Sequence, residues 1–406
     1  MAPASTPPDL PRTRTNPFDP PPEYAALRAE APISRFVWPN GVEGWLVTTY
    51  DEVRKLLADP RLSINRFNSP PPSVSVVKDR KPEAMLPRSL VAMDPPEHTP
   101  WRRAIVREMT PRWARSMEPR IQAITREYLE RIRDTGPPAD LVPELALPVP
   151  SRVICEVLGV PAADQEFFQE QAEVRSQVGA PPDRVNAATT ALYEYLDQLV
   201  SDKRKAGDAE DVLARLARAE IAGEPAPHDI VVGQAMLLLI AGHETTANMI
   251  GLGVATLMDN RERIADLSDT VKGAALVEEI MRMHAIIQWG IIRRATADID
   301  LEVNGENVHI AAGDWVVSSL ASANRDESRY GCPHAVDTGQ NQAPHLTFGY
   351  GVHQCAGQSL ARTEVRVVLR ELFAMFPELR TTSPVAELRY RKDMWVYGLF
   401  ECPVVW

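Results

Sequence analysis

Residues 229–259 are a long, strongly apolar stretch that contains no proline. At 1.5 Å per residue, an unbroken helix over this stretch would be on the order of 45 Å long. A helix that is apolar on all sides belongs in the interior of a protein, because a surface helix needs a polar face. Its longest wholly apolar run, residues 235–241, is far shorter than the roughly 20 residues that span a bilayer. We therefore expect a fold organised around one central, buried helix.

The remaining periodic segments predict shorter helices and small strand pairs. Residues 44–50 are expected to form a strand, after which Asp51 caps a short helix. Asn304-Gly305, between two alternating apolar segments, is the strongest hairpin signal in the chain. Residues 69–90 have little periodicity and are expected to form a long loop. Further helices are expected over residues 121–132, 153–158, 167–177, 186–205 and 358–376. The predicted fold class is mainly α with small β-sheets.

Composition limits the domain organisation and the partners. The chain has 406 residues and 44% hydrophobic content, enough for a large core, and nothing marks an internal linker. We expect one domain over residues 23–406. Prolines are frequent in residues 1–22, which are expected to form an extended arm over the surface. The net charge of −11 argues against nucleic acid as the main partner.

Cysteine usage and the N-terminal sequence predict the compartment. Four widely spread cysteines show no paired metal spacing, which fits free thiols in a reducing cytoplasm. No charged-then-apolar leader is visible, so neither a signal peptide nor a membrane anchor is expected. We expect a soluble, cytoplasmic monomer. The cysteines are Cys155, Cys332, Cys355 and Cys402.

Cys355 lies in a glycine-rich loop directly before the helix expected over residues 358–376. Residues 348–357 read Phe-Gly-Tyr-Gly-Val-His-Gln-Cys-Ala-Gly. Glycine lets the backbone adopt positive φ and approach a flat ligand closely. A helix N-terminus favours the thiolate form of a neighbouring cysteine. The loop suits a thiolate that binds a metal from one side; a structural cysteine in a turn is the alternative.

The pattern Phe-Gly-x-Gly-x-x-x-Cys-x-Gly resembles the haem-ligand loop of the cytochrome P-450 superfamily. The resemblance covers about residues 16–406, and residues 146–160 and 237–248 look especially like actinomycete hydroxylases of antibiotics and foreign compounds. It implies the cytochrome P-450 fold, with haem b (iron protoporphyrin IX) between the long central helix and the cysteine-loop helix. It implies that Cys355 is the iron ligand. The loop residues that it assigns to the haem are Phe348, Gly349 and Gly357.

Residues 241–246, in the middle of the central stretch, read Ala-Gly-His-Glu-Thr-Thr. Ala241 and Gly242 leave room for a flat cofactor and a diatomic ligand, although glycine costs a helix about 1 kcal/mol relative to alanine. A threonine hydroxyl can bond the carbonyl of the preceding turn and bend the helix. The resemblance to the family's acid–alcohol pair assigns proton delivery to Glu244 and Thr245. The alternative is a kinked core helix with a surface glutamate.

The resemblance also predicts which residues bind the two haem propionates, which need cationic or donor partners. His98 and Arg102 share one helical face at i,i+4. Arg293 enters the first strand after the Glu-x-x-Arg helix, and His353 lies two residues before the cysteine. The resemblance assigns all four to the propionates.

Glu279 and Arg282 match the family's Glu-x-x-Arg pair, whose i,i+3 spacing places both side chains on one helix face. The resemblance implies that this pair is buried and holds the cysteine loop; a solvated salt bridge is the alternative. The family's third member, an arginine fifteen residues before the cysteine, is replaced by Gln340. Either the triad is reduced to a pair, or another arginine substitutes, for which Arg329 is the candidate.

The chain shows no Gly-x-Gly-x-x-Gly dinucleotide motif and no cysteine set for an iron–sulfur cluster, so electrons must come from another protein. By resemblance, two arginine clusters lie on the proximal side and suit an acidic ferredoxin, itself served by a ferredoxin reductase. The clusters are Arg102, Arg103, Arg107, Arg112 and Arg115, and then Arg362, Arg366 and Arg370.

The expected substrate contacts are mostly apolar and suit a medium-sized hydrophobic natural product or foreign compound. We expect a monooxygenase that uses O₂ to hydroxylate or epoxidise it, in secondary metabolism such as antibiotic biosynthesis. Ring closure or C–C or C–S bond formation on the same scaffold, and a non-catalytic haem sensor, are the alternatives. The expected contact residues are Met236, Ile240, Ile287, Trp289, Trp395 and Val396.

Overall fold

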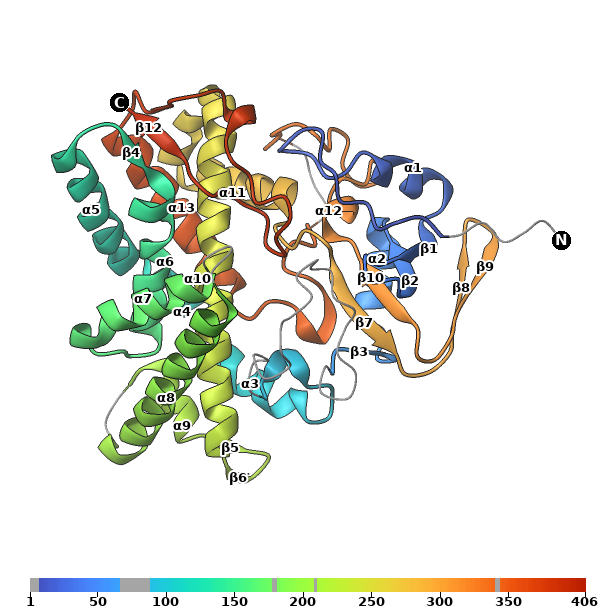
Figure 1. Cartoon of the computed structure of the whole chain (residues 1–406), viewed down its shortest axis with the longest axis horizontal. Helices are drawn as coiled ribbons and strands as arrows, with labels where there is room; N and C mark the ends of the chain where they lie inside the picture. The colour runs from blue at the N-terminus through green and yellow to red at the C-terminus, as the bar shows by residue number, and fades with distance from the viewer. Residues whose placement is uncertain (1–6, 66–87, 177–180, 208–209, 340–343) are drawn as a thin grey trace. The chain divides into compact units, whose positions relative to one another are not determined.

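The computed structural model describes residues 7–65, 88–176, 181–207, 210–339 and 344–406. The fold is mainly helical with small β-sheets, as predicted (Figure 1). The chain forms two compact units. The first comprises Met1–Lys78, Leu252–Cys355 and Ser383–Phe400, and the second comprises Asp79–Gly251, Ala356–Thr382 and Glu401–Trp406.

The first unit contains a five-stranded sheet with the order β1-β2-β10-β7-β3. Strand β2 pairs with β1 in antiparallel fashion and with β10 in parallel fashion, although β10 lies far along the chain. A separate hairpin joins β8 to β9. The elements are α1 (Glu23–Glu30), β1 (Ile33–Val37), β2 (Glu43–Val47), α2 (Tyr50–Leu57), β3 (Leu62–Ser63), α11 (Thr270–His284), β7 (Ile291–Ala295), β8 (Ile299–Val303), β9 (Glu306–Ile310), β10 (Trp315–Ser318) and α12 (Leu320–Ala323).

The turn of the β8–β9 hairpin confirms the strongest local prediction. Asn304 and Gly305 have φ of 53° and 80°. Two successive residues with positive φ are typical of the type I′ turn, which matches the twist of the two flanking strands. The burial of β8 alternates along the strand, so only one of its faces is packed.

Part of the proline-rich N-terminal segment is built into the first unit. Leu10 is only 3% exposed and belongs to a core cluster with Phe36, Trp38 and Trp289. Its backbone N–H donates to Val37 O at 3.2 Å, which continues the edge of β1. The segment is extended, and its apolar side chains contribute to the core.

The second unit is helical, with two small sheets. Helix α13 packs against both α4 and α5, and α7 packs along α8. The short strands form a three-stranded sheet, β11-β12-β4, and a β5–β6 pair. The elements are α3 (His98–Glu108), α4 (Pro111–Ser116), α5 (Glu118–Thr135), β4 (Ala139–Asp140), α6 (Pro148–Val157), α7 (Gln165–Ser176), α8 (Pro182–Ala206), α9 (Val212–Ala217), β5 (Glu220–Ile221), β6 (Glu224–Pro225), α13 (Gln358–Met375), β11 (Arg380–Thr381) and β12 (Pro403–Val405).

Helix α10 (His228–Asp259) confirms the predicted long apolar helix almost to the residue and is the long yellow-green helix in Figure 1. Its first 24 residues belong to the second unit and its last turns to the first. By length and composition α10 could cross a membrane, but 72% of its most apolar window is buried inside the protein. It is therefore a core helix.

Two local predictions need comment. Helix α2 begins at Tyr50 and its N-cap is Thr49, so the prediction that Asp51 caps it was wrong. Asp51 instead lies in the first turn, where a carboxylate favours the positive end of the helix dipole. Most of the loop expected over residues 69–90, and Gln340, lie outside the described residues.

Candidate functional site

Two glycines of the cysteine loop in the first unit adopt the left-handed conformation that favours glycine. Gly349 and Gly351 have φ of 70° and 77°. A Cβ on Gly351 would lie 2.8 Å from the carbonyl oxygen of Leu57, so no other residue fits there. The backbone N–H of Cys355 donates to Phe348 O at 2.8 Å and closes the loop. The thiol is thereby presented by a tightly constrained backbone.

The four cysteines differ in exposure: two are buried and two are exposed. Cys155 and Cys402 are buried, and burial raises the pKa of each thiol to about 12, so both are protonated at neutral pH. Cys332 and Cys355 are exposed. Within the described ranges, no group of three or more His, Cys, Asp or Glu side chains could hold a metal ion by itself.

The Glu279–Arg282 pair on α11 is buried, as the resemblance implied. The two side chains are 4% and 1% exposed, and Arg282 Nη2 lies 2.7 Å from Glu279 Oε1. Arg282 Nε also donates to Glu279 Oε2 at 2.8 Å, which makes the pair bidentate. The solvated alternative is thereby excluded.

Arg329, the candidate for a substituting arginine, does not join the buried pair. Arg329 pairs with Asp51 at the surface and lies over the ring of Tyr50. The buried pair is instead joined by Arg325, which is fully buried and shares an acceptor, the carbonyl oxygen of Pro333, with Arg282. The side chain of Arg329 lies against Tyr50 and Asp51 of α2 and therefore does not reach the buried pair.

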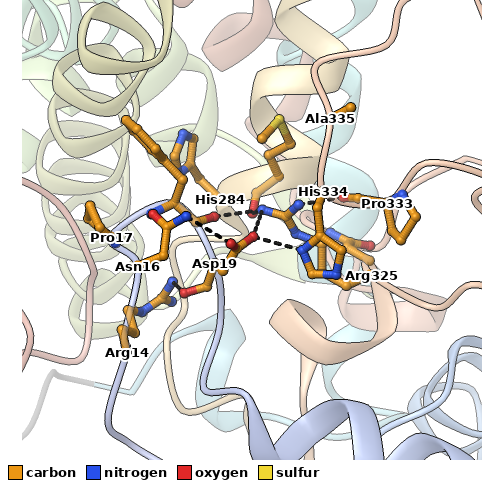
Figure 2. A network of polar contacts seen from close by, with 12 residues as sticks. Arg14, Asn16, Pro17, Asp19, His284, Arg325, Pro333, His334 and Ala335 are labelled. Atoms are coloured by element: carbon orange, nitrogen blue, oxygen red, sulfur yellow. Dashed lines mark hydrogen bonds and ion pairs between the residues drawn. The ribbon is translucent and has the colours of Figure 1, made fainter. Parts of the chain in front are cut away.

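Arg325 is the centre of a polar network that ties the N-terminal segment to the end of α11 (Figure 2). It donates to Phe18 O at 2.6 Å and to Met283 O at 3.0 Å, and its Nη2 lies 3.5 Å from an Asp19 carboxylate oxygen. His334 Nδ1 also contacts Asp19, at 2.8 Å. Burial lowers the pKa of Arg325 to about 9, and Asp19 opposes this shift. The guanidinium therefore keeps its charge at neutral pH.

In the second unit, α10 has a short accessible window in an otherwise buried helix. Between Val231 and Leu257 every residue is buried outside this window. Ala241 is exposed in the middle of the window, and Thr245 Oγ1 donates to Ala241 O at 2.5 Å. The predicted back-bond of the threonine is therefore present. The window consists of Ile240, Ala241, Gly242, Glu244 and Thr245.

Gly242 has a packing role that the sequence did not suggest. A Cβ at this position would lie 3.1 Å from Cδ1 of Ile154 on α6. The absence of a side chain therefore lets α6 approach α10 closely, in addition to any room it leaves for a ligand. The space that a side chain at Gly242 would fill is taken by Ile154 of α6.

The four residues expected to bind propionates lie on three elements. His98 begins α3 and is 1% exposed, and Arg102 lies one turn further on the same helix and is half-buried. Arg293 lies in β7 and is 4% exposed; its Nη1 donates to Leu62 O at 3.5 Å. His353 lies in the short 3₁₀ turn of the cysteine loop. The structure thus brings His98 beside Arg102, and His353 into one loop with Cys355.

The expected substrate contacts of the first unit lie on two facing segments. Ile287 and Val396 form an isolated antiparallel bridge, and both are half-buried. Trp289 is 3% exposed in the core cluster and meets the ring of Trp395 edge-on at 6.0 Å. Gln288 Nε2 donates to Met394 O at 2.8 Å and fastens the two segments together.

Of the substrate contacts expected on α10, Met236 is fully buried and Ile240 is half-buried. Ile240 therefore belongs to the accessible window, and Met236 lies one turn before it.

The expected basic clusters differ in how available their charges are. Arg366 and Arg370 on α13 both pair with Glu118 of α5, at 2.6 and 3.0 Å. Burial alone would raise the pKa of Glu118, but the hydrogen bonds from these two arginines lower it below its ordinary value. Their charge is therefore largely compensated. Four arginines of α3 and α4 are exposed instead: Arg103, Arg107, Arg112 and Arg115.

Comparison with known proteins identifies the family. A sequence model of the cytochrome P-450 family matches residues 182–379. The chain is 40% identical over 399 residues to 20-oxo-5-O-mycaminosyltylactone 23-monooxygenase of Streptomyces fradiae, covering 98% of this chain and 92% of that protein. It is 39% identical over 401 residues to vitamin D3 dihydroxylase of Streptomyces griseolus, covering 98% and 97%.

A solved structure agrees with these relatives. The mycinamicin VIII C21 methyl hydroxylase of Micromonospora griseorubida, bound to mycinamicin VIII, superposes with a TM-score of 0.86 at 37% identity, covering 98% of this chain and 100% of that chain. The chain therefore belongs to the cytochrome P-450 family. It is a cytochrome P-450 monooxygenase of the actinomycete type, and haem b is its cofactor.

The described residues fit this cofactor on two observations. The loop that carries the family's cysteine presents an exposed thiol, although two other cysteines of the chain are buried. Between Val231 and Leu257, the core helix α10 is accessible only around Ala241, next to Glu244 and Thr245. A flat apolar cofactor needs such openings in otherwise closed packing.

Proposed function

We propose that this monooxygenase hydroxylates or epoxidises a medium-sized hydrophobic natural product in secondary metabolism. The observation that carries the proposal is the exposed Cys355 thiol on a loop fixed by Gly349 and Gly351. The substrates in the names of its relatives, a glycosylated macrolactone and vitamin D3, support the size and polarity of the substrate class. A foreign compound of similar size would fit the same description.

In this proposal the thiolate of Cys355 would hold the iron. Four residues would hold the propionates: His98, Arg102, Arg293 and His353. When bound, the haem supplies the redox chemistry that activates O₂. The cysteine loop and α10 would also contact the haem. The residues are Phe348, Gly349 and Gly357 of the loop and Ala241 and Gly242 of α10.

Glu244 and Thr245 move protons to the activated oxygen. The hydroxyl proton of Thr245 is held on Ala241 O at 2.5 Å, so the oxygen lone pairs of the threonine remain available to accept from water or substrate. Replacing Thr245 with Ala should leave substrate binding intact and divert electrons from product to hydrogen peroxide. Unchanged yield of product per NAD(P)H consumed would contradict this role.

The iron ligand is tested by the absorption of the reduced protein under carbon monoxide. Cys355→Ser should abolish the red-shifted band of a thiolate complex. Cys332→Ser is a matched control, because Cys332 is the other exposed cysteine among the described residues. Loss of the band in both variants, or in neither, would refute the assignment.

Product analysis separates the proposed reaction from its alternatives. A screen of hydrophobic compounds by optical difference spectra would first identify ligands that displace iron-bound water. Turnover of such a ligand with ferredoxin and ferredoxin reductase should give a product heavier by one oxygen atom. Ring closure or coupling would give a different mass, and a haem sensor would consume no NAD(P)H in response to the ligand.

For electron supply we propose a ferredoxin that docks on the exposed arginines of α3 and α4. The acidic chain, with net charge −11, repels acidic proteins elsewhere, so a local basic patch can steer the encounter. Arg112→Glu with Arg115→Glu should slow reduction and weaken its salt dependence. Arg133→Glu, at the far end of α5, is the control. Equal reduction rates of all variants at every ionic strength would contradict the docking site.

The remaining expectations stay proposals. We propose that the protein acts as a cytoplasmic monomer, with residues 1–22 as an N-terminal arm and residues 23–406 as one domain. Size-exclusion chromatography with light scattering tests the monomer, and a truncation after residue 22 tests the arm. Because Leu10 and Arg14 are buried, we expect this truncation to lower stability.

A further inference from the structure

Asn324, the C-cap residue of α12, is a fully buried side chain with three hydrogen bonds. Its Nδ2 donates to Thr347 Oγ1 at 2.8 Å and to the carbonyl oxygen of Arg282 at 3.3 Å. Its Oδ1 accepts from the backbone N–H of Leu346 at 2.7 Å. A side-chain amide offers two donors and an acceptor, so this site uses each kind of group.

Two of these partners are the residues that lead into the cysteine loop. Leu346 O accepts from the N–H of Gly349 at 2.8 Å, and Phe348 O accepts from the N–H of Cys355 at 2.8 Å. Thr347 Oγ1 in turn donates to Met281 O on α11, also at 2.8 Å. Leu346 and Thr347, the first leg of the loop, are thus hydrogen-bonded to Asn324, and Thr347 is bonded to α11 as well.

The backbone of Asn324 is held by the buried ion pair. Arg282 Nη1 donates to Asn324 O at 2.7 Å. In the described part of the chain, the other acceptors of Arg282 are Glu279 and the carbonyls of Pro333 and Ala335. Among the described residues, the hydrogen bonds that join the Glu279–Arg282 pair to the loop therefore pass through Asn324.

We propose that Asn324 is the positioning residue that transmits the Glu279–Arg282 pair to the cysteine loop and so fixes the direction of the Cys355 thiolate. The inference rests on the proposed role of Cys355 as iron ligand. Without the Asn324 side chain, the N–H of Leu346 loses its acceptor, and the hydroxyl oxygen of Thr347 loses its donor and keeps only its bond to Met281 O. The first leg of the loop can then shift, and the thiolate bond competes less well with protonation of the sulfur.

The test uses the holoprotein and two optical bands of its reduced carbon monoxide complex, one from the thiolate-ligated and one from the non-thiolate form. Asn324→Ala should raise the ratio of non-thiolate to thiolate form at least about tenfold, because both buried hydrogen bonds between this side chain and the loop are lost. Thr347→Val, which removes one of these bonds and the bond to Met281, should raise it less. The double variant should show less than the sum of the two effects, because both act through one contact.

Thr256→Val is the matched control for a loss of stability alone. Thr256 is 1% exposed, donates to Leu252 O at 2.8 Å and contacts His284 Nε2 at 2.7 Å. These contacts are made with α10 and α11 and do not involve residues of the loop. This variant should lower the urea midpoint and leave the band ratio unchanged.

The outcomes separate this inference from the proposed function. If the wild type itself lacks the thiolate band, or Cys355→Ser keeps it, the iron ligand is wrong. If Asn324→Ala and Thr347→Val lose stability but keep the wild-type band ratio, Asn324 is merely structural and the inference fails. If Asn324→Ala does not fold, the ratio measured in Thr347→Val decides alone.

Discussion

Helix α13 carries two buried glutamates in opposite electrostatic surroundings, and they give a prediction with a defined sign. Glu364 is 3% exposed, and among the described residues its Oε2 has no hydrogen-bond partner. Burial is the cause that raises its pKa well above the ordinary value. The carboxyl group is therefore protonated in the folded state under conditions in which the unfolded chain ionises it.

The sign and size of the effect follow from this difference. A raised folded pKa means that stability is fully present below the ordinary pKa of glutamate and is lost as pH rises towards the folded pKa. The loss is about 1.4 kcal/mol for each pH unit between the two pKa values. Glu364→Gln is neutral at every pH and should remove this loss, so the variant gains on the wild type as pH rises.

Glu371, two turns later, provides the matched control. It is 7% exposed, and although burial alone would raise its pKa, hydrogen bonds from Arg126, Gln122 and Arg370 lower it. Its contribution to stability is present above the ordinary pKa and is lost as pH falls through the lowered one. Glu371→Gln should cost about 1–2 kcal/mol at neutral pH, because charge-assisted hydrogen bonds are weakened.

The assay is urea unfolding of the holoprotein between pH 5 and 8, followed by tryptophan fluorescence. The free-energy difference between Glu364→Gln and wild type should grow with pH. The difference between Glu371→Gln and wild type should stay constant, because this whole range lies above the ordinary pKa of glutamate. Parallel pH profiles for Glu364→Gln and the wild type would show that Glu364 is ionised in the folded protein. The assignment of burial as the dominant cause would then be refuted.

Two glycine substitutions test other parts of the structure. Gly351→Ala should destabilise the protein by more than the strain of a left-handed residue, about 1–2 kcal/mol, because its Cβ would lie 2.8 Å from Leu57 O. Gly41→Ala is the control, because Gly41 has a φ of 83° but open space around it, so this variant should cost the strain alone. Equal urea midpoints of the two variants would contradict the clash. Gly242→Ala gains about 1 kcal/mol of helix propensity, but its Cβ would lie only 3.1 Å from Cδ1 of Ile154. Adding Ile154→Val removes this crowding and should recover stability. Strict additivity of the two effects on the unfolding free energy would contradict this coupling.

Much of the fold could be predicted because local signals decide it. The length of α10 follows from a continuous apolar stretch, and the β8–β9 turn follows from Asn304-Gly305, whose positive φ values few other residues adopt as readily. The five-stranded sheet could not be predicted in this way. Its central contact pairs β2 with β10, and neither strand carries information about a partner that lies so far along the chain.

The candidate site divides along the same line. The predictions for Cys355, Glu244 and Thr245 rest on motifs whose spacing lies within a few residues. The back-bond of Thr245 to Ala241 is local too, and it is present in the structure. The packing of Ile154 against Gly242 was missed, because contact between two helices has no local signature.

Arg325 shows most clearly why some residues near the site could not be predicted. Its guanidinium is held mainly by backbone carbonyls, those of Phe18, Met283 and Pro333, whereas the candidate Arg329 pairs with a carboxylate at the surface.

Every residue has a backbone carbonyl, so the residue type at a position does not show whether it will accept a hydrogen bond from a buried arginine. The same is true of Asn324, which reaches the loop through the N–H of Leu346. The positions of the buried guanidinium groups in this region therefore depend on where the backbone places its carbonyl oxygens. A substitution that moves the backbone near Pro333 should thus disturb Arg282 and Arg325 together, although it removes no charge.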